Sequence, residues 1–472
     1  MIYPRKTKII CTIGPATESI ENLRLLVSKG MNIARLNFSH GSYEKHKQTV
    51  ANLRQVCDEC NSYVAILQDL QGPKIRTEKV ENGAVNLEEG QDFIITTREI
   101  ELGNSQIVST SYLNLPNDLK ANDTILIDDG YLIVKVEKIE GTDIFCKVIK
   151  GGILKDRKGL IAPNVVFSAP ALSDKDIEDL KFGLSIGVDM VALSFVSSGR
   201  DIVELKTTMK IFGRSVPIVA KIERPEAIKN IDSIMEECDA MMIARGDLGL
   251  EYPVEDVPLL QKDLINKCNT KGMPVITATQ MLESMINNPR PTRAEASDVA
   301  NAVFDSSDAL MLSGETSVGK YPIIALENMT NIIKKVEDKI YNIPFGDRLY
   351  QNLDNNTMDA IAHAATAIAE QINASAIVVL SNIDNAIKKV AKYRPRIPLL
   401  GITNNIELLR RMSIIWGVQP ILIEGENSFQ NVFDYLSKNK NIIPNIGSGD
   451  NIVFVSGLNN PFNENTIKVY KY

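Results

Sequence analysis

The feature of this sequence that most restricts its fold is a short apolar segment followed by a helical pattern, a combination that recurs eight times. The apolar segments occupy residues 8–14, 32–38, 64–70, 188–195, 216–223, 239–245, 273–280 and 308–315. Near-continuous apolar strands that alternate with helices are typical of a parallel sheet buried on both faces. Eight such units predict an α/β fold closed into a (β/α)8 TIM barrel.

The third repeat is interrupted by a segment of different character. Residues 73–170 contain no strong helical pattern, and short alternating stretches such as 124–139 and 143–152 are separated by Gly, Asn and Asp. Such stretches indicate strands joined by turns. We therefore predict a small β domain inserted into the third β/α connection, hinged at Gly72–Pro73 and returning near Pro170.

The strand–helix pattern restarts after the last expected barrel helix, at 321–340. A helix is expected at 357–372, followed by the strand-like segments AIVVLS, IPLLGIT, VQPILIE and NIVFVSG, which predict a C-terminal open α/β domain. A chain of 472 residues has room for about three domains. The predicted domains are a catalytic barrel at 1–72 and 171–340, an inserted β-barrel lid at 73–170 and a regulatory-type α/β domain at 341–472.

Composition excludes several classes of function. The net charge of −7 argues against a general nucleic-acid-binding protein, which needs a basic face. The chain has no long apolar run, and its first residues, MIYPRKTKII, lack a signal-peptide core, so we expect a cytoplasmic protein with no membrane partner. Cys57 and Cys60 form a lone CxxC inside a helical pattern, which favours ordinary thiols over a zinc site. Only three histidines are present, which excludes a histidine-rich metal site.

Polar residues gather where the predicted barrel strands end. Reactive groups of such barrels lie at the carboxyl ends of the strands. The polar residues found there are Arg35, Asn37, Asp69, Ser194, Lys221, Glu223, Arg245, Asp247, Thr279 and Glu315. Side chains two apart on a strand face the same way, so Arg35/Asn37, Lys221/Glu223 and Arg245/Asp247 are expected to act as pairs. Each pair alone could be a structural ion pair, but their repetition around one rim predicts a functional site.

The residue types indicate the chemistry of this site. Two carboxylates without histidine or thiol partners, Glu223 and Asp247, suit a hard cation such as Mg²⁺. Arg35, Arg76 and Lys221 suit phosphate groups. A metal ion and fixed cations around a phosphate are the components of phosphoryl transfer. The chain has neither a P-loop nor the protein-kinase motifs, so a nucleotide must be held in another way.

Long segments of the chain stand in the order and spacing of one enzyme family. They are KIICTIGPAT, MNIARLNFSHGSYEKH, QGPKIRT, AKIERPEAI, ARGDLGLE, TATQMLESM, PRPTRAEASDVANAV and SGETSVGKYP. Through them the chain resembles pyruvate kinases over nearly its whole length. The resemblance implies a homotetramer that transfers a phosphoryl group from phosphoenolpyruvate to ADP, giving pyruvate and ATP in the last step of glycolysis. It also implies Mg²⁺ as the cofactor, with Mn²⁺ as an alternative.

The resemblance assigns roles to the residues at the centre of the rim. Glu223 and Asp247 would hold the Mg²⁺ ion. Lys221 would stabilise the phosphoryl group in flight, and Arg35 would bind the same group from the other side.

A second group of residues would hold the remainder of phosphoenolpyruvate. The backbone amides of Gly246 and Asp247, with Thr279, would bind the substrate carboxylate. Thr279 would also lie where the enolate takes up its proton, although Thr277 and Thr279 could simply cap the end of a strand.

The resemblance places the nucleotide between the barrel and the lid. Asn37, His40 and Arg76 would contact its phosphates, and Lys158 would reach it when the lid closes and excludes water. His40 could equally be a surface residue without this role. Where many family members read KKGVNLPG, this lid reads RKGLIAPN, so Ile161 and Ala162 make the wall beside Lys158 more apolar.

Two other functions compete with an active pyruvate kinase. A different barrel enzyme that handles phosphoenolpyruvate or pyruvate with Mg²⁺ would lack the inserted lid and Lys158. A non-catalytic relative would have lost Lys221 or a metal carboxylate, and neither is lost.

The C-terminal domain departs from activated family members. These carry a Ser/Thr–Gly loop after the first strand of this domain, which cradles a sugar phosphate. Here Ser381 remains, but Ile383, Asp384 and Ala386 replace a hydroxyl, the glycine and a second hydroxyl. We therefore predict no activation by fructose 1,6-bisphosphate at this loop. Another effector could bind elsewhere, for instance near the glycines of IGSGD.

The last departure concerns the monovalent cation of potassium-dependent members. The resemblance places that cation at Asn37, Ser39, Asp69 and Leu70. Leu70 lacks the expected hydroxyl, Gln71 replaces a base, and Lys74 replaces an acid. An ammonium group at Lys74 could neutralise Asp69 and the phosphate in place of potassium, so potassium is not expected to be required. The simpler interpretation is that Lys74 is a solvated hinge residue.

Overall fold

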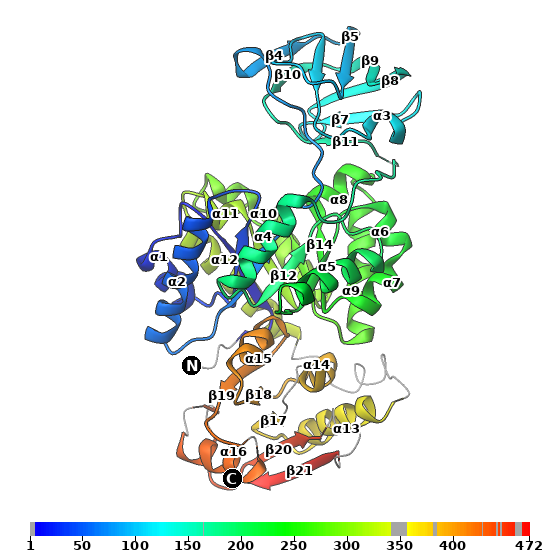
Figure 1. The fold of residues 1–472 in the computed structure, drawn as a ribbon. Coiled ribbons are helices and arrows are strands. Elements are labelled where there is room, and N and C mark those ends of the chain that lie inside the picture. Colours follow the sequence, from blue (N-terminus) through cyan, green and yellow to red (C-terminus); the bar gives the residue numbers. More distant parts are fainter. Residues whose placement is uncertain are drawn as a thin grey trace.

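The chain forms three bodies arranged in a row, with the lid at one end of the barrel and the C-terminal domain at the other (Figure 1). This computed structural model describes residues 5–340 and 356–472, apart from 164, 381–384, 427, 440–441, 444–445 and 458–464.

The central body is a closed barrel of eight parallel strands. In barrel order these are β1 (Lys8–Ile13), β2 (Ile33–Asn37), β3 (Ala65–Asp69), β12 (Met190–Leu193), β13 (Ile218–Ile222), β14 (Ala240–Ala244), β15 (Val275–Ala278) and β16 (Ala309–Leu312), with β16 closing onto β1. Each of the eight predicted segments contains one strand, which confirms the barrel. Both faces of the sheet are buried, which is why the segments are apolar throughout.

Helices surround the barrel on the outside (Figure 1). They are α1 (Ile20–Ser28), α2 (Tyr43–Glu59), α4 (Asp174–Ser185), α5 (Gly199–Ile211), α6 (Pro225–Lys229), α7 (Ile231–Glu237), α8 (Arg245–Glu251), α9 (Val257–Lys271), α10 (Arg293–Phe304), α11 (Gly314–Ser317) and α12 (Pro322–Ile340). Ser173 and Asp176 form the capping box expected at the start of α4, and this fixes where the chain re-enters the barrel from the lid.

The lid lies between β3 and α4. Its main sheet has the order β11-β7-β8-β9-β5-β6, and a second small sheet pairs β4 with β10. The strands are β4 (Ala84–Leu87), β5 (Asp92–Thr96), β6 (Ile107–Ser109), β7 (Thr124–Ile127), β8 (Leu132–Glu140), β9 (Asp143–Lys150), β10 (Gly152–Lys155) and β11 (Leu160–Ile161). One short helix, α3 (Leu115–Asp118), accompanies them. The lid has a hydrophobic core of its own, so it can move as a unit.

The C-terminal domain is an open α/β sheet with the order β19-β18-β17-β20-β21. Its elements are α13 (Thr357–Gln371), β17 (Ala376–Leu380), α14 (Asn385–Lys392), β18 (Leu399–Thr403), α15 (Ile406–Arg411), β19 (Val418–Leu422), α16 (Phe429–Lys438), β20 (Asn451–Ser456) and β21 (Thr466–Lys471). The first four strands match the predicted segments. The antiparallel edge strand β21 was not predicted.

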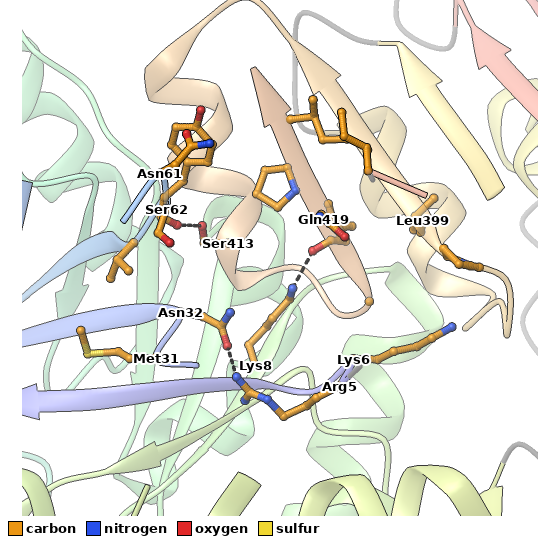
Figure 2. A pocket seen from close by; sticks show the side chains of 18 of the residues that line it. Arg5, Lys6, Lys8, Met31, Asn32, Asn61, Ser62, Leu399, Ser413 and Gln419 are labelled. Carbon is orange, nitrogen blue, oxygen red and sulfur yellow. Dashed lines mark hydrogen bonds between the residues drawn. The ribbon is translucent and has the colours of Figure 1, made fainter. Parts of the chain in front are cut away.

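A cavity of about 680 Å³ lies where this domain meets the barrel, at the end opposite the lid. Two lysines that precede and begin β1 cross the boundary beside it (Figure 2). Lys8 Nζ donates to Val418 O at 2.6 Å, and Lys6 Nζ donates to Arg396 O at 2.7 Å. These bonds attach the C-terminal domain directly to the first barrel strand.

The described residues contain neither a membrane-spanning helix nor a cluster of metal ligands of the kinds named here. Among them, no helix has the length and apolar character needed to cross a membrane. Within the same residues, no three His, Cys, Asp or Glu side chains gather as metal ligands. Cys57 is buried on α2, and Cys60 follows that helix as its C-cap.

Candidate active site

Lys221, on β13, is the centre of the polar cluster at the carboxyl end of the barrel. Its Nζ donates to Ser194 Oγ at 2.6 Å and lies 2.9 Å from Glu223 Oε1 and 3.4 Å from Asp69 Oδ1. Ser194 Oγ in turn donates to Leu70 O at 2.8 Å. Three neighbouring strands therefore contribute to one ion-pair network, as the strand ends had predicted.

Arg35 extends this network to a fourth strand. Its Nε donates to Asp69 Oδ2 at 2.6 Å, and its Nη1 donates to Thr12 Oγ1 at 2.9 Å. Thr12 is a site residue that sequence reasoning missed. Its only signal is a hydroxyl within an otherwise apolar strand.

Burial and neighbouring charges act against each other on these groups. Burial alone would raise the pKa of Asp69, but the charges of Lys221 and Arg35 outweigh it and lower that pKa. Burial alone would lower the pKa of Lys221, but the charges of Asp69 and Glu223 raise it. Asp69 and Lys221 are therefore both ionised around neutral pH.

Glu223 is the group in this cluster with unused bonding capacity. Its Oε2 accepts a hydrogen bond from Phe195 N at 2.6 Å, whereas its buried Oε1 has the Lys221 ion pair but no hydrogen bond. Burial raises the pKa of Glu223, and the charge of Asp247 raises it further against the opposing charge of Lys221. A divalent cation would add positive charge beside both carboxylates and reverse this shift, so Glu223 and Asp247 fit a metal ion.

Asp247 reaches the site from a helix rather than from a strand. β14 ends at Ala244 and α8 begins at Arg245, so the expectation that Arg245 and Asp247 form a strand pair is wrong. Arg245 instead donates to Asp298 Oδ1 at 2.7 Å and to Thr279 O at 2.8 Å. Its role is to hold the chain after β15.

Glu315 also has a structural role. Its carboxylate is fully buried and accepts hydrogen bonds from Leu282 N at 3.0 Å and Ser313 N at 2.7 Å. β16 ends at Leu312, so the expectation that Glu315 stands at the end of a strand is wrong: it lies in α11. Both of its oxygens are satisfied by backbone groups, so this acid is not available to a substrate.

Thr279 and Gly246 are joined directly. Gly246 N donates to Thr279 Oγ1 at 2.8 Å, and the hydroxyl donates to Ala278 O at 2.6 Å. Thr279 has a φ of 65°, a left-handed conformation that is strained for a β-branched residue. The two residues that were expected to share one substrate group therefore lie together, and Thr279 holds its place on strained backbone.

Lys74 lies in the first connection to the lid and points at Asp247. Its Nζ is 4.0 Å from Asp247 Oδ1. Among the described residues, Asp69 forms ion pairs with Arg35 and Lys221 only, so the expected neutralisation of Asp69 by Lys74 is not seen. Lys74 is 28% exposed and is therefore not a fully solvated hinge residue either.

The expected nucleotide contacts are spread between the barrel and the lid. His40 is exposed beyond β2, and Asn37 Oδ1 accepts from Ser39 N at 3.1 Å within the same turn. Arg76 Nη1 donates to Arg157 O at 3.1 Å. Lys158 Nζ pairs with Asp128 Oδ1 at 2.8 Å, so its ammonium contacts the lid itself.

Comparisons with known proteins agree with this arrangement. Residues 4–326 match the family described as pyruvate kinase, barrel domain, and residues 359–470 match pyruvate kinase, alpha/beta domain. A pyruvate kinase of Mycobacterium tuberculosis is 44% identical over 453 residues, which are 96% of this chain and 95% of that protein. Pyruvate kinase 2 of Synechocystis sp. is 47% identical over 89% of this chain and 71% of its own length.

The fold has a solved counterpart. The crystal structure of a pyruvate kinase from Cryptosporidium parvum superposes with a TM-score of 0.93 at 37% identity, covering 99% of this chain and 96% of that one.

Proposed function

The chain belongs to the pyruvate kinase family and is a phosphotransferase, and we propose that it uses the rim network to move a phosphoryl group from phosphoenolpyruvate to ADP with Mg²⁺. The observation that carries this proposal is Lys221, a lysine with only 12% of its side chain exposed, kept charged by Asp69 and Glu223. A fixed positive charge in a buried site stabilises negative charge that develops in the transition state.

Lys221 and Arg35 would bind the transferring phosphoryl group from two directions. Both cations share Asp69, whose ionised carboxylate holds the guanidinium and the ammonium in place. This preorganisation means that little rearrangement is needed when the phosphate arrives.

Glu223 and Asp247 would hold the Mg²⁺ ion. When bound, the ion supplies charge neutralisation to the phosphoryl group and to the carbonyl side of the substrate. Two protein carboxylates suit Mg²⁺, which usually takes its other ligands from water and substrate phosphates. Mn²⁺ suits the same oxygen ligands.

Thr279 and Gly246 would receive the other end of the substrate. Their mutual hydrogen bond in the free protein provides a hydroxyl and an amide that can both turn to a carboxylate. We assign to Thr279 the position beside the carbon that takes up the proton. The amide of Asp247 would complete this carboxylate site.

The nucleotide would contact Asn37, His40 and Arg76. Lys158 would exchange its ion pair with Asp128 for one with the nucleotide phosphates. A partly exposed ion pair contributes little stability, so nucleotide phosphates can displace it readily. The lid would then close over the site and exclude water.

We also propose that the enzyme needs no potassium. The ammonium of Lys74 stands near the metal carboxylates, and a unit charge about 4 Å from a phosphate is worth ~4 kcal/mol at an effective dielectric of about 20. Asn37, Ser39, Asp69 and Leu70, the positions of the monovalent-cation site in the family, would then hold no ion. Activity should be nearly complete in sodium buffers, and strong stimulation by potassium would contradict this.

Regulation by fructose 1,6-bisphosphate is proposed to be absent. Ser381, Ile383 and Asp384 lie outside the described residues. Ala386 is buried on α14 and offers no hydroxyl to a phosphate. A saturation curve for phosphoenolpyruvate that shifts strongly on adding this compound would overturn the proposal.

The homotetramer, the cytoplasmic location and the domain bounds of 1–72 with 171–340, 73–170 and 341–472 remain proposals from the sequence. Sedimentation of the purified chain tests the first. The central experiment is a coupled assay for pyruvate formed from phosphoenolpyruvate and ADP with Mg²⁺. Product formation that requires all three supports the mechanism, and its absence would contradict it.

A further inference from the structure

Arg224, the residue after the metal carboxylate Glu223, lies near two aromatic rings that belong to different domains. Its guanidinium carbon is 4.8 Å from the ring centre of Phe195 and 5.7 Å from that of Phe167. Among the described residues no carboxylate lies within ion-pair distance of it. The rings are therefore the direct neighbours of this charge, and both distances suit a cation–π contact.

Phe167 belongs to the lid. It is 9% exposed within the lid core, and its ring meets Tyr112 edge-on at 6.0 Å between centroids. It lies on the segment that returns from the lid to α4. When the lid turns, Phe167 must turn with it or leave this core.

Phe195 belongs to the barrel and touches the metal site. Its backbone N–H donates to Glu223 Oε2 at 2.6 Å, and its φ of 56° is a strained conformation for a bulky residue. This strain persists because the surrounding structure holds it. Any shift of Phe195 therefore moves the group that orients Glu223.

The outgoing connection to the lid meets the same residue. A Cβ on Gly72 would lie 3.0 Å from Phe195 Cδ2 and 3.0 Å from Ser194 Cβ, at a φ of +69° that also disfavours side chains. Gly72 N donates to Asp176 Oδ1 at 3.1 Å, in the capping box of the returning connection. The outgoing connection thus packs against Phe195 and is hydrogen-bonded to the returning one, while Phe167 of the returning connection reaches Phe195 only through Arg224.

We propose that Arg224 is a positioning residue which, through Phe167 and Phe195, links the orientation of the lid to the orientation of the Glu223 carboxylate. The inference rests on the proposed role of Glu223 as a metal ligand. With the lid in one orientation, Phe167 and Arg224 hold the Phe195 backbone where it fixes Glu223 Oε2. With the lid in another, this support is weakened and the metal is held less tightly. Metal and nucleotide affinity are therefore coupled through residues that touch neither.

The test compares Arg224→Met, Phe167→Leu and the double variant with the unmodified enzyme. Arg224→Met keeps the length of the side chain but removes the charge and the planar group. We expect the concentration of Mn²⁺ at half-saturation, followed by the electron paramagnetic resonance of free Mn²⁺ with ADP present, to rise about fivefold. The KM for ADP should rise by a similar factor, with kcat changed less.

The double variant separates coupling from independent effects. If Arg224 and Phe167 act as one unit, the double variant binds Mn²⁺ no more weakly than the worse single variant. Phe167→Tyr keeps an aromatic ring and should bind Mn²⁺ as tightly as the unmodified enzyme. Arg200→Met, an exposed arginine on α5, is the matched control and should change nothing.

Unchanged Mn²⁺ binding in Arg224→Met would overturn the proposal, as would losses that multiply in the double variant. A lower melting temperature with unchanged Mn²⁺ affinity would show a purely structural role and would also overturn it. Mn²⁺ binding does not depend on turnover. An enzyme that forms no pyruvate but shows the predicted Mn²⁺ shifts would therefore contradict the proposed function and leave the coupling supported.

Discussion

Two buried lysines at opposite ends of the barrel show how their partners determine their charge. Lys221 at the catalytic rim faces Asp69 and Glu223, and these carboxylates raise its pKa against the effect of burial. Lys8 at the start of β1 donates to a backbone carbonyl, Val418 O, and burial lowers its pKa to about 7. Carboxylate oxygens lie 2.9 and 3.4 Å from Lys221 Nζ, and at that range their charge outweighs burial. Among the described residues Lys8 has no ion pair; the charge of Arg5 lowers its pKa further, and those of Glu337 and Asp308 oppose burial only in part.

This difference fits the two ends to different tasks. In the proposed function the rim holds a phosphate, which calls for a permanent positive charge, and carboxylates surround its lysine. The opposite end needs a joint between domains, and Lys6 and Lys8 provide hydrogen bonds there whether or not they are charged. Lys6 also has a pKa lowered to about 7 by burial, against the charges of Glu337 and Glu370.

The largest expected effect comes from removing the rim charge. Lys221→Met should lower kcat by roughly a thousandfold or more, because the lysine meets charge that is greatest in the transition state. Binding of phosphoenolpyruvate should change much less. The matched control is Lys8→Met at the other end, which should keep kcat within about threefold. Near-normal turnover by Lys221→Met would mean that the rim lysine is not the catalytic charge.

The next effect concerns Lys74, whose single ion pair among the described residues is with Asp247, at 4.0 Å. Lys74→Glu should lower activity in sodium buffer by roughly tenfold or more, since it replaces a positive charge near the phosphate with a negative one. Potassium should then restore much of the loss. Lys74→Met, which is neutral, should show a smaller loss with partial recovery. If neither variant responds to potassium, Lys74 does not substitute for the ion.

The sequence was sufficient to predict most of this rim, and the reasons are local. Lys221 and Glu223 lie two apart at the end of one strand, where period-two geometry brings them to the same side. The same rule failed for Arg245 and Asp247 because β14 ends one residue earlier and a helix begins. No pattern of residue types predicts the end of a strand to within one residue.

Other parts of the site depend on contacts that no short segment encodes. The sequence predicts Phe195 as the apolar end of a strand, yet its positive φ and its hydrogen bond to Glu223 make it part of the polar cluster at the rim. Lys74 was expected beside Asp69, but the path of the lid connection brings it to Asp247. The position of the lid connection in the folded chain, and not its amino-acid composition, determines which carboxylate Lys74 approaches. The edge strand β21 was missed for a similar reason, since its pairing with β20 is what makes it a strand.

The pH dependence of stability distinguishes the two lysine environments. Lys8 loses its proton near pH 7 in the folded chain but near 10.5 when unfolded. Between these values the unfolded chain binds more protons, so stability rises with pH by up to about 1.4 kcal/mol per pH unit. The free energy of unfolding of wild type, measured at pH 7, 8 and 9, should therefore increase with pH relative to that of Lys8→Met.

Lys221 provides the contrast for this measurement. Its pKa is raised in the folded chain, so it is charged in both states from pH 7 to 9 and contributes no slope there. The stability difference between wild type and Lys221→Met should stay flat over that range. A flat difference for Lys8→Met as well would mean that water reaches Lys8 and that its charge is not suppressed.

The smallest expected effect involves Lys158, a lysine whose carboxylate partner must be exchanged for substrate. Its Nζ pairs with Asp128 at 2.8 Å, with both side chains about a quarter exposed or slightly more, at 30% and 26%. Such a pair is worth roughly 0.2–1 kcal/mol, so Asp128→Asn should lower the KM for ADP by about two- to threefold.

Asp129→Asn is the matched control. Both residues have left-handed φ angles, 53° and 52°, which asparagine tolerates, but among the described residues Asp129 has no ion pair. Asp129→Asn should therefore leave the KM unchanged. A higher KM in Asp128→Asn would contradict the idea that Asp128 and the nucleotide compete for Lys158. It would show instead that Asp128 orients Lys158 toward the nucleotide, as the rim carboxylates orient Lys221.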